Sequence, residues 1–431
     1  MMKWSRPMMP TAVPDRGKRG YFRWTVCALL FAATTINYID RQVLGILAPH
    51  LQKIIGWSES QYGYIVTAFQ VAYAVGIAIF GRFIDKFGTR IGYAVSLVIW
   101  SFAAMAHAAA RSAVGFAAAR FALGLGETGN FPTAIKTVAE WFPRRERALA
   151  TGIFNAGSNV GAVIAPAVVP WLMVKFGWPA AFIATGAIGF TWLIFWFALY
   201  EVPERKKGLR PAELAHILSD PVEPAPEKIS WLRLLRYKQT WAIVLGKFLT
   251  DPVWWFYIYW LPKFLHSKFG LSLTALGPPL IVVYLFADVG SVGGGWMSSA
   301  LLKKGRSVNR SRKSVMLISA LAVVPIVTAT GASGLWTAVL LIGLAAAAHP
   351  AWSANIFTFA SDMFPKQAVG SVTGLGGMAG AVGGILFSAA AGNILEWTGS
   401  YYPLFIYAGS AYLVALGIIH VLAPRLKPVE F

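Results

Sequence analysis

Apolar residues fill twelve long stretches of the chain. The stretches lie roughly at 24–47, 61–80, 91–110, 113–140, 147–174, 178–200, 240–262, 274–300, 314–331, 334–359, 367–393 and 401–423. Each is near the roughly 20 residues that an α-helix needs to cross the hydrocarbon core of a bilayer. The pattern therefore predicts an all-α membrane protein with twelve transmembrane helices.

The composition agrees with residence in a membrane. Hydrophobic residues make up 57% of the 431 residues and charged residues 13%, with a mean hydropathy of +0.58. The charged share is about half that of a soluble protein, which is too little to cover a water-facing surface. The same numbers exclude a disordered chain, and the one cysteine, Cys27, excludes an internal disulfide and a cysteine-based metal site.

The net charge of +20 has two readings, nucleic-acid binding or membrane topology. If the N-terminus is placed in the cytoplasm, the cytoplasmic segments carry 29 of the 38 Lys and Arg residues and the outer loops carry five. Such a bias is what the positive-inside rule predicts. We therefore expect a multi-pass protein of the cell inner membrane with both termini in the cytoplasm, and no nucleic-acid partner.

A polar segment divides the twelve stretches six and six. Residues 201–239 hold eight Lys and Arg, six Asp and Glu and five prolines, which is typical of a solvated linker. Pro211 stands at a plausible first helical position and predicts a short helix within it. We therefore expect an N-terminal six-helix half at 1–200, a cytoplasmic linker at 201–239 and a C-terminal six-helix half at 240–431.

The two halves resemble each other at an offset of 222 residues. Segment 140–144 (Glu-Trp-Phe-Pro-Arg) corresponds to 362–366 (Asp-Met-Phe-Pro-Lys), and the same offset relates Thr151-Gly152 to Thr373-Gly374 and Gly161 to Gly383. Glycine is frequent in membrane helices, so a single match carries little weight, but several matches at one offset indicate a repeat. Two related six-helix halves around a midplane site are an architecture of transporters.

Segment 81–90 (Gly-Arg-Phe-Ile-Asp-Lys-Phe-Gly-Thr-Arg) resembles the signature loop of the major facilitator superfamily, with Asp85 as its acidic member. The equivalent loop of the second half has Ser299 where the acid would stand. The resemblance implies the major facilitator fold, with two pseudo-symmetric six-helix halves. It also implies a role in conformational change for four residues of the first loop, Gly81, Asp85, Gly88 and Arg90.

Further segments resemble the anion:cation symporter branch of that superfamily. They are 37–41 (Asn-Tyr-Ile-Asp-Arg), 120–124, Glu127 and 130–132. Segments 246–255 and 286–290 are similar to the hexuronate transporters within that branch. The resemblance extends from about Tyr21 to Pro424, and it implies transport of an organic anion.

Ionisable groups inside a bilayer are costly, so each one is a candidate for function. Arg120 and Glu127 are seven residues apart and share one helix face, whereas the adjacent Asp40 and Arg41 point about 100° apart. Together with Lys247 from the second half, the two arginines offer charge to an anionic substrate. An arginine suits a carboxylate through two parallel hydrogen bonds.

The resemblance implies roles for the matching positions, with Asp40 and Glu127 in proton coupling. We expect substrate contacts from Arg41, Tyr73, Arg120, Asn155, Ser158, Lys247 and Trp255. Internal salt bridges that only hold helices together are the alternative for the charged residues, and anchoring at the membrane interface is the alternative for the tryptophan.

Nothing in the sequence indicates an enzyme. Segment 124–129 fits G-x-G-x-x-G, but it lies inside an apolar helix with no strand before it. The histidines form no metal-binding motif, and we expect no cofactor. We therefore expect a monomeric proton symporter that imports a hexuronate by alternating access. An aldonate or another carboxylate as substrate, coupling to sodium, and a non-transporting sensor on the same fold remain alternatives.

Overall fold

The computed structural model describes residues 20–219 and 230–429, and this part of the chain contains helices and no strand. The α-helices are, in chain order, α1 (Phe22–Ile55), α2 (Glu59–Ala106), α3 (Ala113–Glu127), α4 (Asn130–Trp141), α5 (Arg144–Phe176), α6 (Trp178–Leu199), α7 (Pro211–Ile217), α8 (Trp231–Leu234), α9 (Lys238–Tyr259), α10 (Leu261–Phe269), α11 (Gly277–Lys303), α12 (Val308–Val323), α13 (Leu335–Met363), α14 (Lys366–Thr398) and α15 (Tyr402–Leu422). Four short 3₁₀ turns join them: η1 (His107–Ala109), η2 (Pro203–Arg205), η3 (Thr274–Leu276) and η4 (Val324–Gly331).

Every predicted apolar stretch is helical, and ten segments of the described residues are long and apolar enough to cross a membrane. The remaining two stretches are interrupted. The stretch 113–140 is divided into α3 and α4, and the stretch 240–262 is divided into α9 and α10 at Trp260. Two of the predicted helices, 61–80 and 91–110, lie within α2, which has non-helical backbone at Gly88 (φ 79°, ψ 170°).

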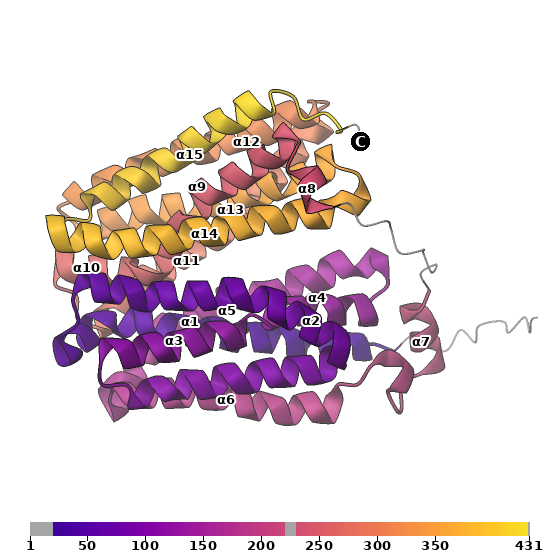
Figure 1. Cartoon of the computed structure of the whole chain (residues 1–431), viewed down its shortest axis with the longest axis horizontal. Coiled ribbons are helices and arrows are strands. Elements are labelled where there is room, and N and C mark those ends of the chain that lie inside the picture. The colour runs from indigo at the N-terminus through magenta and orange to yellow at the C-terminus, as the bar shows by residue number, and fades with distance from the viewer. Residues whose placement is uncertain (1–19, 220–229, 430–431) are drawn as a thin grey trace, which may run out of the picture.

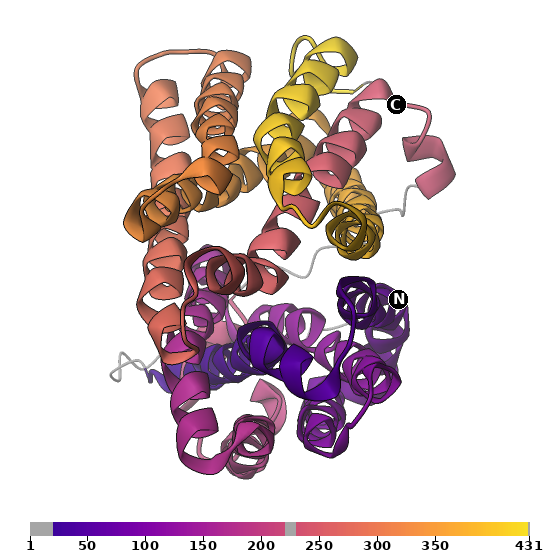
Figure 2. The ribbon, with the colours of Figure 1, turned by 90° about the vertical axis from the view of Figure 1, so that its left-hand side faces the viewer.

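The helices form two bundles that lie side by side (Figures 1 and 2). The first bundle contains α1–α6, and the second contains α9–α15. They meet mainly through two helix pairs, α2 with α14 and α5 with α11, and α1 also contacts α9 and α10. Helix α7 and the C-terminal end lie at one end of the molecule, which we call the α7 end, and α10 lies at the opposite end, which we call the α10 end (Figure 1).

The internal repeat has a structural counterpart. Pro143 precedes α5 and Pro365 precedes α14 with nearly the same backbone angles, φ −63° and ψ 153° against φ −65° and ψ 156°. Proline at such a position ends one helix and starts the next, because its ring fixes φ. Gly161 of α5 and Gly383 of α14 each face the backbone of the first long helix of their own bundle, at Thr35 O and Phe248 O. Both glycines therefore permit close packing at equivalent places.

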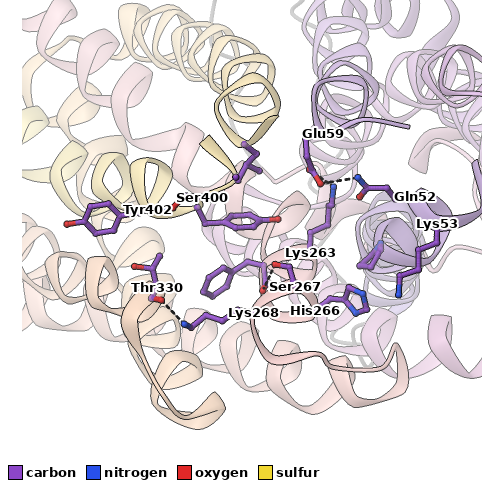
Figure 3. A pocket seen from close by; sticks show the side chains of 15 residues that line it. Gln52, Lys53, Glu59, Lys263, His266, Ser267, Lys268, Thr330, Ser400 and Tyr402 are labelled. Atoms are coloured by element: carbon purple, nitrogen blue, oxygen red, sulfur yellow. Dashed lines mark hydrogen bonds and ion pairs between the residues drawn. The ribbon is translucent and has the colours of Figure 1, made fainter. Parts of the chain in front are cut away.

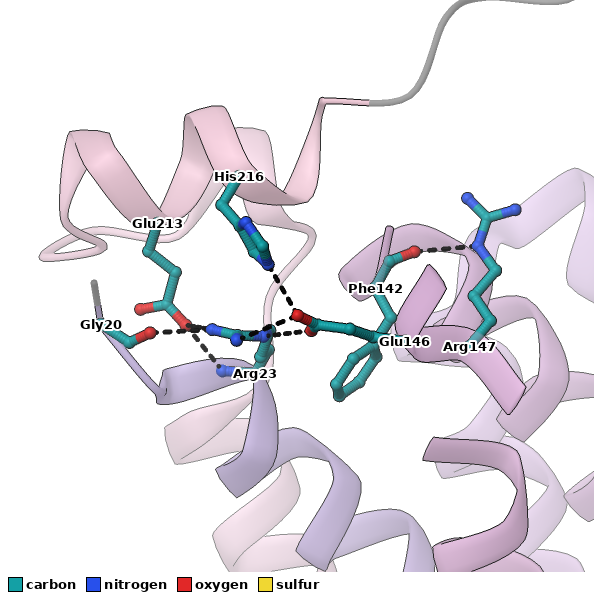
Figure 4. A network of polar contacts seen from close by, with 7 residues as sticks. All are labelled: Gly20, Arg23, Phe142, Glu146, Arg147, Glu213 and His216. Atoms are coloured by element: carbon teal, nitrogen blue, oxygen red, sulfur yellow. Dashed lines mark hydrogen bonds and ion pairs between the residues drawn. The ribbon is translucent and has the colours of Figure 1, made fainter. Parts of the chain in front are cut away.

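The linker helix α7 begins at Pro211, as predicted, and is attached to the first bundle by a polar network (Figure 4). Arg23 Nε donates to Glu146 Oε2 (2.8 Å), and the Arg23 backbone N–H donates to Glu213 Oε1 (3.1 Å). His216 Nε2 lies 2.9 Å from Glu146 Oε1. The starts of α1 and α5 and the linker helix are thus joined by one arginine and two carboxylates.

The two bundles are in tight contact at the α10 end. Tyr62 Oη donates to the backbone oxygen of Tyr259 (2.6 Å), and Lys263 Nζ forms an ion pair with Glu59 Oε2 (2.5 Å). A Cβ added to Gly63 of α2 would lie 2.9 Å from a backbone oxygen of α14. The α10 end is therefore closed by direct contact between the bundles.

Candidate functional site

The first part of the site is a buried ion pair inside the first bundle. Arg41 comes from the middle of α1, and Glu127 is the last residue of α3. Arg41 Nε and Nη2 lie 2.8 and 2.7 Å from Glu127 Oε2, and the side chains are 3% and 0% exposed. Charges this deeply buried must be paired, because solvation by water is lost. Arg41 therefore has Glu127 as its counter-ion, whereas its sequence neighbour Asp40 points elsewhere.

Aromatic rings surround the guanidinium of Arg41. Its Cζ atom lies 4.7 Å from the centre of the Tyr38 ring and 5.1 Å from both Phe69 and Tyr73. Trp255 of the second bundle lies 6.0 Å away. Aromatic faces attract cations and tolerate the flat guanidinium well. The site thus places Tyr73 and Trp255, both predicted from the sequence, around the same arginine.

Arg120 lies next to the pair with unused hydrogen-bonding capacity. Its Nη2 donates to the backbone oxygen of Arg41 (2.8 Å), and its side chain is fully buried. Among the described residues no acceptor lies within hydrogen-bond distance of Arg120 Nε and Nη1, and Glu127 Oε1 is likewise without a donor. Unsatisfied buried donors are costly, so these N–H groups are candidates for binding the acceptor groups of a ligand.

Asp40 is buried on the other side of α1. It is 2% exposed and faces α6, where the hydroxyl of Thr185 donates to the backbone oxygen of Phe182 (3.5 Å). Within residues 20–219 and 230–429, neither carboxylate oxygen of Asp40 has a hydrogen-bond partner. Asp40 therefore differs from Glu127, which has a fixed cation.

A cavity of about 190 Å³ lies between the two bundles. Its wall combines residues of α1 and α5 with residues of α9, α11 and α13, and it includes the predicted Asn155 and Ser158. Tyr38 separates it from the guanidinium of Arg41, because the same ring contacts both. The volume is below the roughly 300–1,000 Å³ of pockets for drug-sized ligands, so the cavity suits a small molecule.

The lining of this cavity is rich in groups that the sequence did not single out as site residues. Eight of them carry hydroxyl, amide, imidazole or carboxylate groups, namely Tyr38, Gln42, Asn159, Tyr284, Asp288, Ser291, His349 and Ser353. Trp254 stacks on His349 with ring centres 5.2 Å apart and planes at 10°. The side chains come from five helices of both bundles, so helix periodicity alone could not have grouped them.

One predicted residue, Lys247, has other neighbours. Lys247 Nζ forms an ion pair with Asp251 Oδ2 (2.8 Å) one turn later on α9, and it lies 4.2 Å from the Phe357 ring. Lys247 is therefore not brought to the two arginines in this conformation. Trp255 faces Arg41, while its neighbour Trp254 lines the cavity.

The predicted conformational loop joins the two helical parts of α2. Gly88 has φ 79°, a left-handed value that favours glycine, and it lets the chain turn near the start of the membrane segment Lys86–Ala109, which follows the segment Glu59–Ile84. Arg90 Nη1 donates to Glu201 Oε2 (2.6 Å), which ties the loop to the end of α6. A Cβ at Gly81 would meet no described atom within 4 Å. The Asp85 side chain lies outside the described part of the structure.

Known proteins similar to this chain share one architecture. A sequence profile of the Major Facilitator Superfamily matches residues 30–388. The chain is 34% identical over 393 residues to the "Hexuronate transporter" of Escherichia coli (strain K12), covering 89% of this chain and 90% of that protein. It is 34% identical over 321 residues to the "Galacturonate transporter" of Dickeya chrysanthemi, covering 73% of this chain and 92% of that protein.

Solved structures support the fold in turn. The structure of a D-xylose–proton symporter matches with a TM-score of 0.74 at 15% identity, covering 94% of this chain and 99% of that one. The predicted all-α membrane fold is thereby confirmed, and so is the resemblance stated from the sequence. The profile covers most of the chain, and the relatives align along nearly their whole length. The chain therefore belongs to the Major Facilitator Superfamily of membrane transporters.

Proposed function

We propose that this chain is a proton-coupled symporter that imports a sugar acid, with a hexuronate such as glucuronate or galacturonate as its substrate. The similarity along 89% of the chain to a protein named hexuronate transporter supports the choice of substrate. One structural observation supports the proposed coupling of proton and anion. The buried pair of Arg41 and Glu127 joins a group that suits a carboxylate to a group that can take a proton.

The pair links proton and anion because both act on Arg41. While Glu127 is ionised, it occupies the guanidinium. A proton on Glu127 removes this negative charge and leaves a buried cation without a counter-ion, which is unfavourable. The carboxylate of a sugar acid then supplies the missing charge, and the free N–H groups of Arg120 supply further donors. Proton and substrate therefore favour each other's binding.

In this proposal the ring of Tyr38 moves aside, and the cavity between the bundles then takes the rest of the sugar. Asn155 and Ser158 offer an amide and a hydroxyl to the sugar hydroxyl groups, and the ring of Trp254 offers an apolar face. A sugar ring has polar edges and apolar C–H faces, so this combination suits it. Asp40, which is buried with no hydrogen-bond partner among the residues that the structure describes, acts as a second proton carrier beside Glu127.

The orientation follows from the distribution of charge. We place the α7 end in the cytoplasm and the α10 end outside, because α7 belongs to the linker, one of the predicted cytoplasmic segments that together carry 29 of the 38 Lys and Arg residues. The close contacts at the α10 end then belong to a state closed to the outside. Transport requires the halves 1–200 and 240–431 to rock about the central site, with 201–239 as the linker and loop 81–90 as part of the switch. The protein acts as a monomer of the inner membrane.

Uptake into proteoliposomes tests the function. The full chain is reconstituted, and labelled glucuronate is offered with an inward proton gradient, an inward sodium gradient or neither. Accumulation above equilibrium with the proton gradient alone is expected. Accumulation with the sodium gradient alone would identify sodium, and not the proton, as the coupling ion.

Competition by unlabelled compounds tests the substrate class in the same assay. Galacturonate and glucuronate are expected to compete strongly, galactonate weakly and glucose not at all, because glucose lacks the carboxylate that Arg41 would bind. Stronger competition by galactonate than by glucuronate would assign an aldonate instead. If no sugar acid is transported, the result would favour the alternative of a non-transporting sensor on the same fold.

A further inference from the structure

The α10 end carries a pocket of about 510 Å³ that is separate from the central cavity (Figure 3). Its wall includes Lys53 at the end of α1 and Glu59 at the start of α2 from the first bundle. Lys263 and Lys268 of α10 belong to the second bundle. The pocket therefore lies across the seam between the bundles, above the contacts that close this end.

The charge of this pocket is unusual for an outer surface. The sequence leaves five Lys and Arg residues in the loops of the α10 side, and three of them line this one pocket. Glu59 is the one acidic residue among the described lining residues. Glu396 lies nearby on α14, but its carboxylate accepts from the backbone N–H of Ser60 and does not line the pocket. The pocket thus keeps a positive charge where the positive-inside rule depletes it.

The contacts of the three lysines differ. Lys263 is 4% exposed and ion-paired with Glu59, which also accepts from Gln52 Nε2 (3.0 Å). Lys268 Nζ donates to the backbone oxygen of Thr330 (2.6 Å), and Lys53 is exposed without a hydrogen-bond or ion-pair partner among the described residues. Two ammonium groups are therefore not neutralised by a carboxylate.

The Lys263–Glu59 pair also has to break during transport. Glu59 belongs to the first bundle and Lys263 to the second, so separation of the bundles at this end pulls them apart. A nearly buried ammonium then needs another anion, because an unpaired buried charge is strongly unfavourable. The carboxylate of an anion in the pocket that Lys53 and Lys268 line is in place to pair with Lys263.

We propose that this pocket is an anion-capture site for the carboxylate of the transported sugar acid. Lys53 and Lys268, on opposite sides of the pocket (Figure 3), attract the anion from outside, and the anion replaces Glu59 on Lys263 when the α10 end opens. This inference rests on the proposed function and orientation. Clefts lined by charge of one sign raise the local concentration of the opposite ion and its rate of association.

Kinetics of uptake from the outside provide the first test. Lys53→Gln removes one charge from the pocket, and Lys175→Gln is the matched control, because Lys175 is an exposed outer lysine that does not line this pocket. At low ionic strength, Lys53→Gln is expected to raise KM for glucuronate by about threefold, and Lys53→Gln with Lys268→Gln by about tenfold, with Vmax within about twofold. The difference shrinks in 0.5 M salt, where screening shortens the range of charge. Equal KM values for both pocket variants and Lys175→Gln would overturn the inference.

A binding measurement separates this inference from the proposed function. In right-side-out membrane vesicles, a membrane-impermeant amine reagent acetylates exposed lysines, and mass spectrometry measures the modification of Lys53 and Lys175. Glucuronate, but not glucose, is expected to protect Lys53 at least threefold more than Lys175. Protection without any transport would refute the transporter proposal and keep the anion site, whereas transport without protection would refute the site alone.

Discussion

Replacing Glu127 by glutamine removes the charge that neutralises Arg41 and nearly preserves the size of the side chain. The wild-type contact is 2.7 Å long, and both groups are at most 3% exposed. Loss of one partner from such a pair costs about 3–5 kcal/mol, because the remaining charge stays buried. The variant without substrate is therefore expected to unfold at a lower temperature than the wild type.

Glu127→Gln also removes the carboxylate that competes with the substrate for Arg41. In the wild type, where Glu127 is ionised, binding of the anion requires uptake of one proton, so Kd rises about tenfold for each unit of increasing pH. Glu127→Gln corresponds to the protonated state at every pH. Its Kd for glucuronate is expected to lose the part of the pH dependence that comes from Glu127, and to be at least about tenfold lower than that of the wild type at the alkaline end.

Three assays on the purified full-length protein check this reasoning. Calorimetry from pH 5 to 9 measures Kd, a thermal-shift assay measures the rise in melting temperature with glucuronate, and proteoliposomes compare gradient-driven accumulation with exchange. Accumulation is expected to be lost and exchange to remain. Asp251→Asn is the matched control, since it also removes the acid of a membrane-embedded pair, with Lys247, and it should leave the pH dependence intact. Weaker binding by Glu127→Gln at all pH values, or equal loss of accumulation and exchange, would refute the competition for Arg41.

Three other residues give direct predictions. Gly63→Val places side-chain atoms against α14, where even a Cβ would lie 2.9 Å from a backbone oxygen. The substitution should therefore open the α10 end. Labelling of a cysteine introduced at that end should rise several-fold. Gly88→Ala forces alanine to φ 79°. The free energy of unfolding should fall by about 1–2 kcal/mol, which lowers the melting temperature. An unchanged melting temperature would contradict the argument that alanine is strained at this position. Burial raises the pKa of Glu146, but hydrogen bonds from Arg23 and His216 outweigh it and lower that pKa below its usual value. The network therefore stabilises the protein fully at pH values above the ordinary pKa of a glutamate carboxylate. This stabilisation is lost as the pH falls through the lowered pKa of Glu146. The melting temperatures of the wild type and Glu146→Gln should differ at pH 7 and converge in acid.

The helices of this protein could be predicted from sequence because bilayer thickness fixes their length. The apolar stretches, the start of α7 at Pro211 and the equivalent prolines before α5 and α14 all depend on local chemistry. The interruption between α3 and α4 was not foreseen. There, Glu127 is followed by Thr128, whose hydroxyl donates to the backbone oxygen of Gly124 (2.8 Å), and such a local contact leaves no mark on the hydropathy profile.

The site could be predicted only along single helices. Spacing placed Arg120 and Glu127 on one face of α3 and separated the directions of Asp40 and Arg41, as the structure confirms. The partner of Arg41 depends on how α1 and α3 are rotated against each other, which packing decides. The proton-coupling and substrate roles of these residues stay predictions.

The attachment of α7 to the first bundle has a practical consequence. Arg23, Glu146 and Glu213 fasten this short helix to the starts of α1 and α5 (Figure 4). A fluorophore on the exposed Ala215 of α7 would therefore follow the first bundle as a rigid marker. Paired with a second dye near the C-terminus, it would turn the motion of the halves into an optical signal without altering any side chain near the cargo.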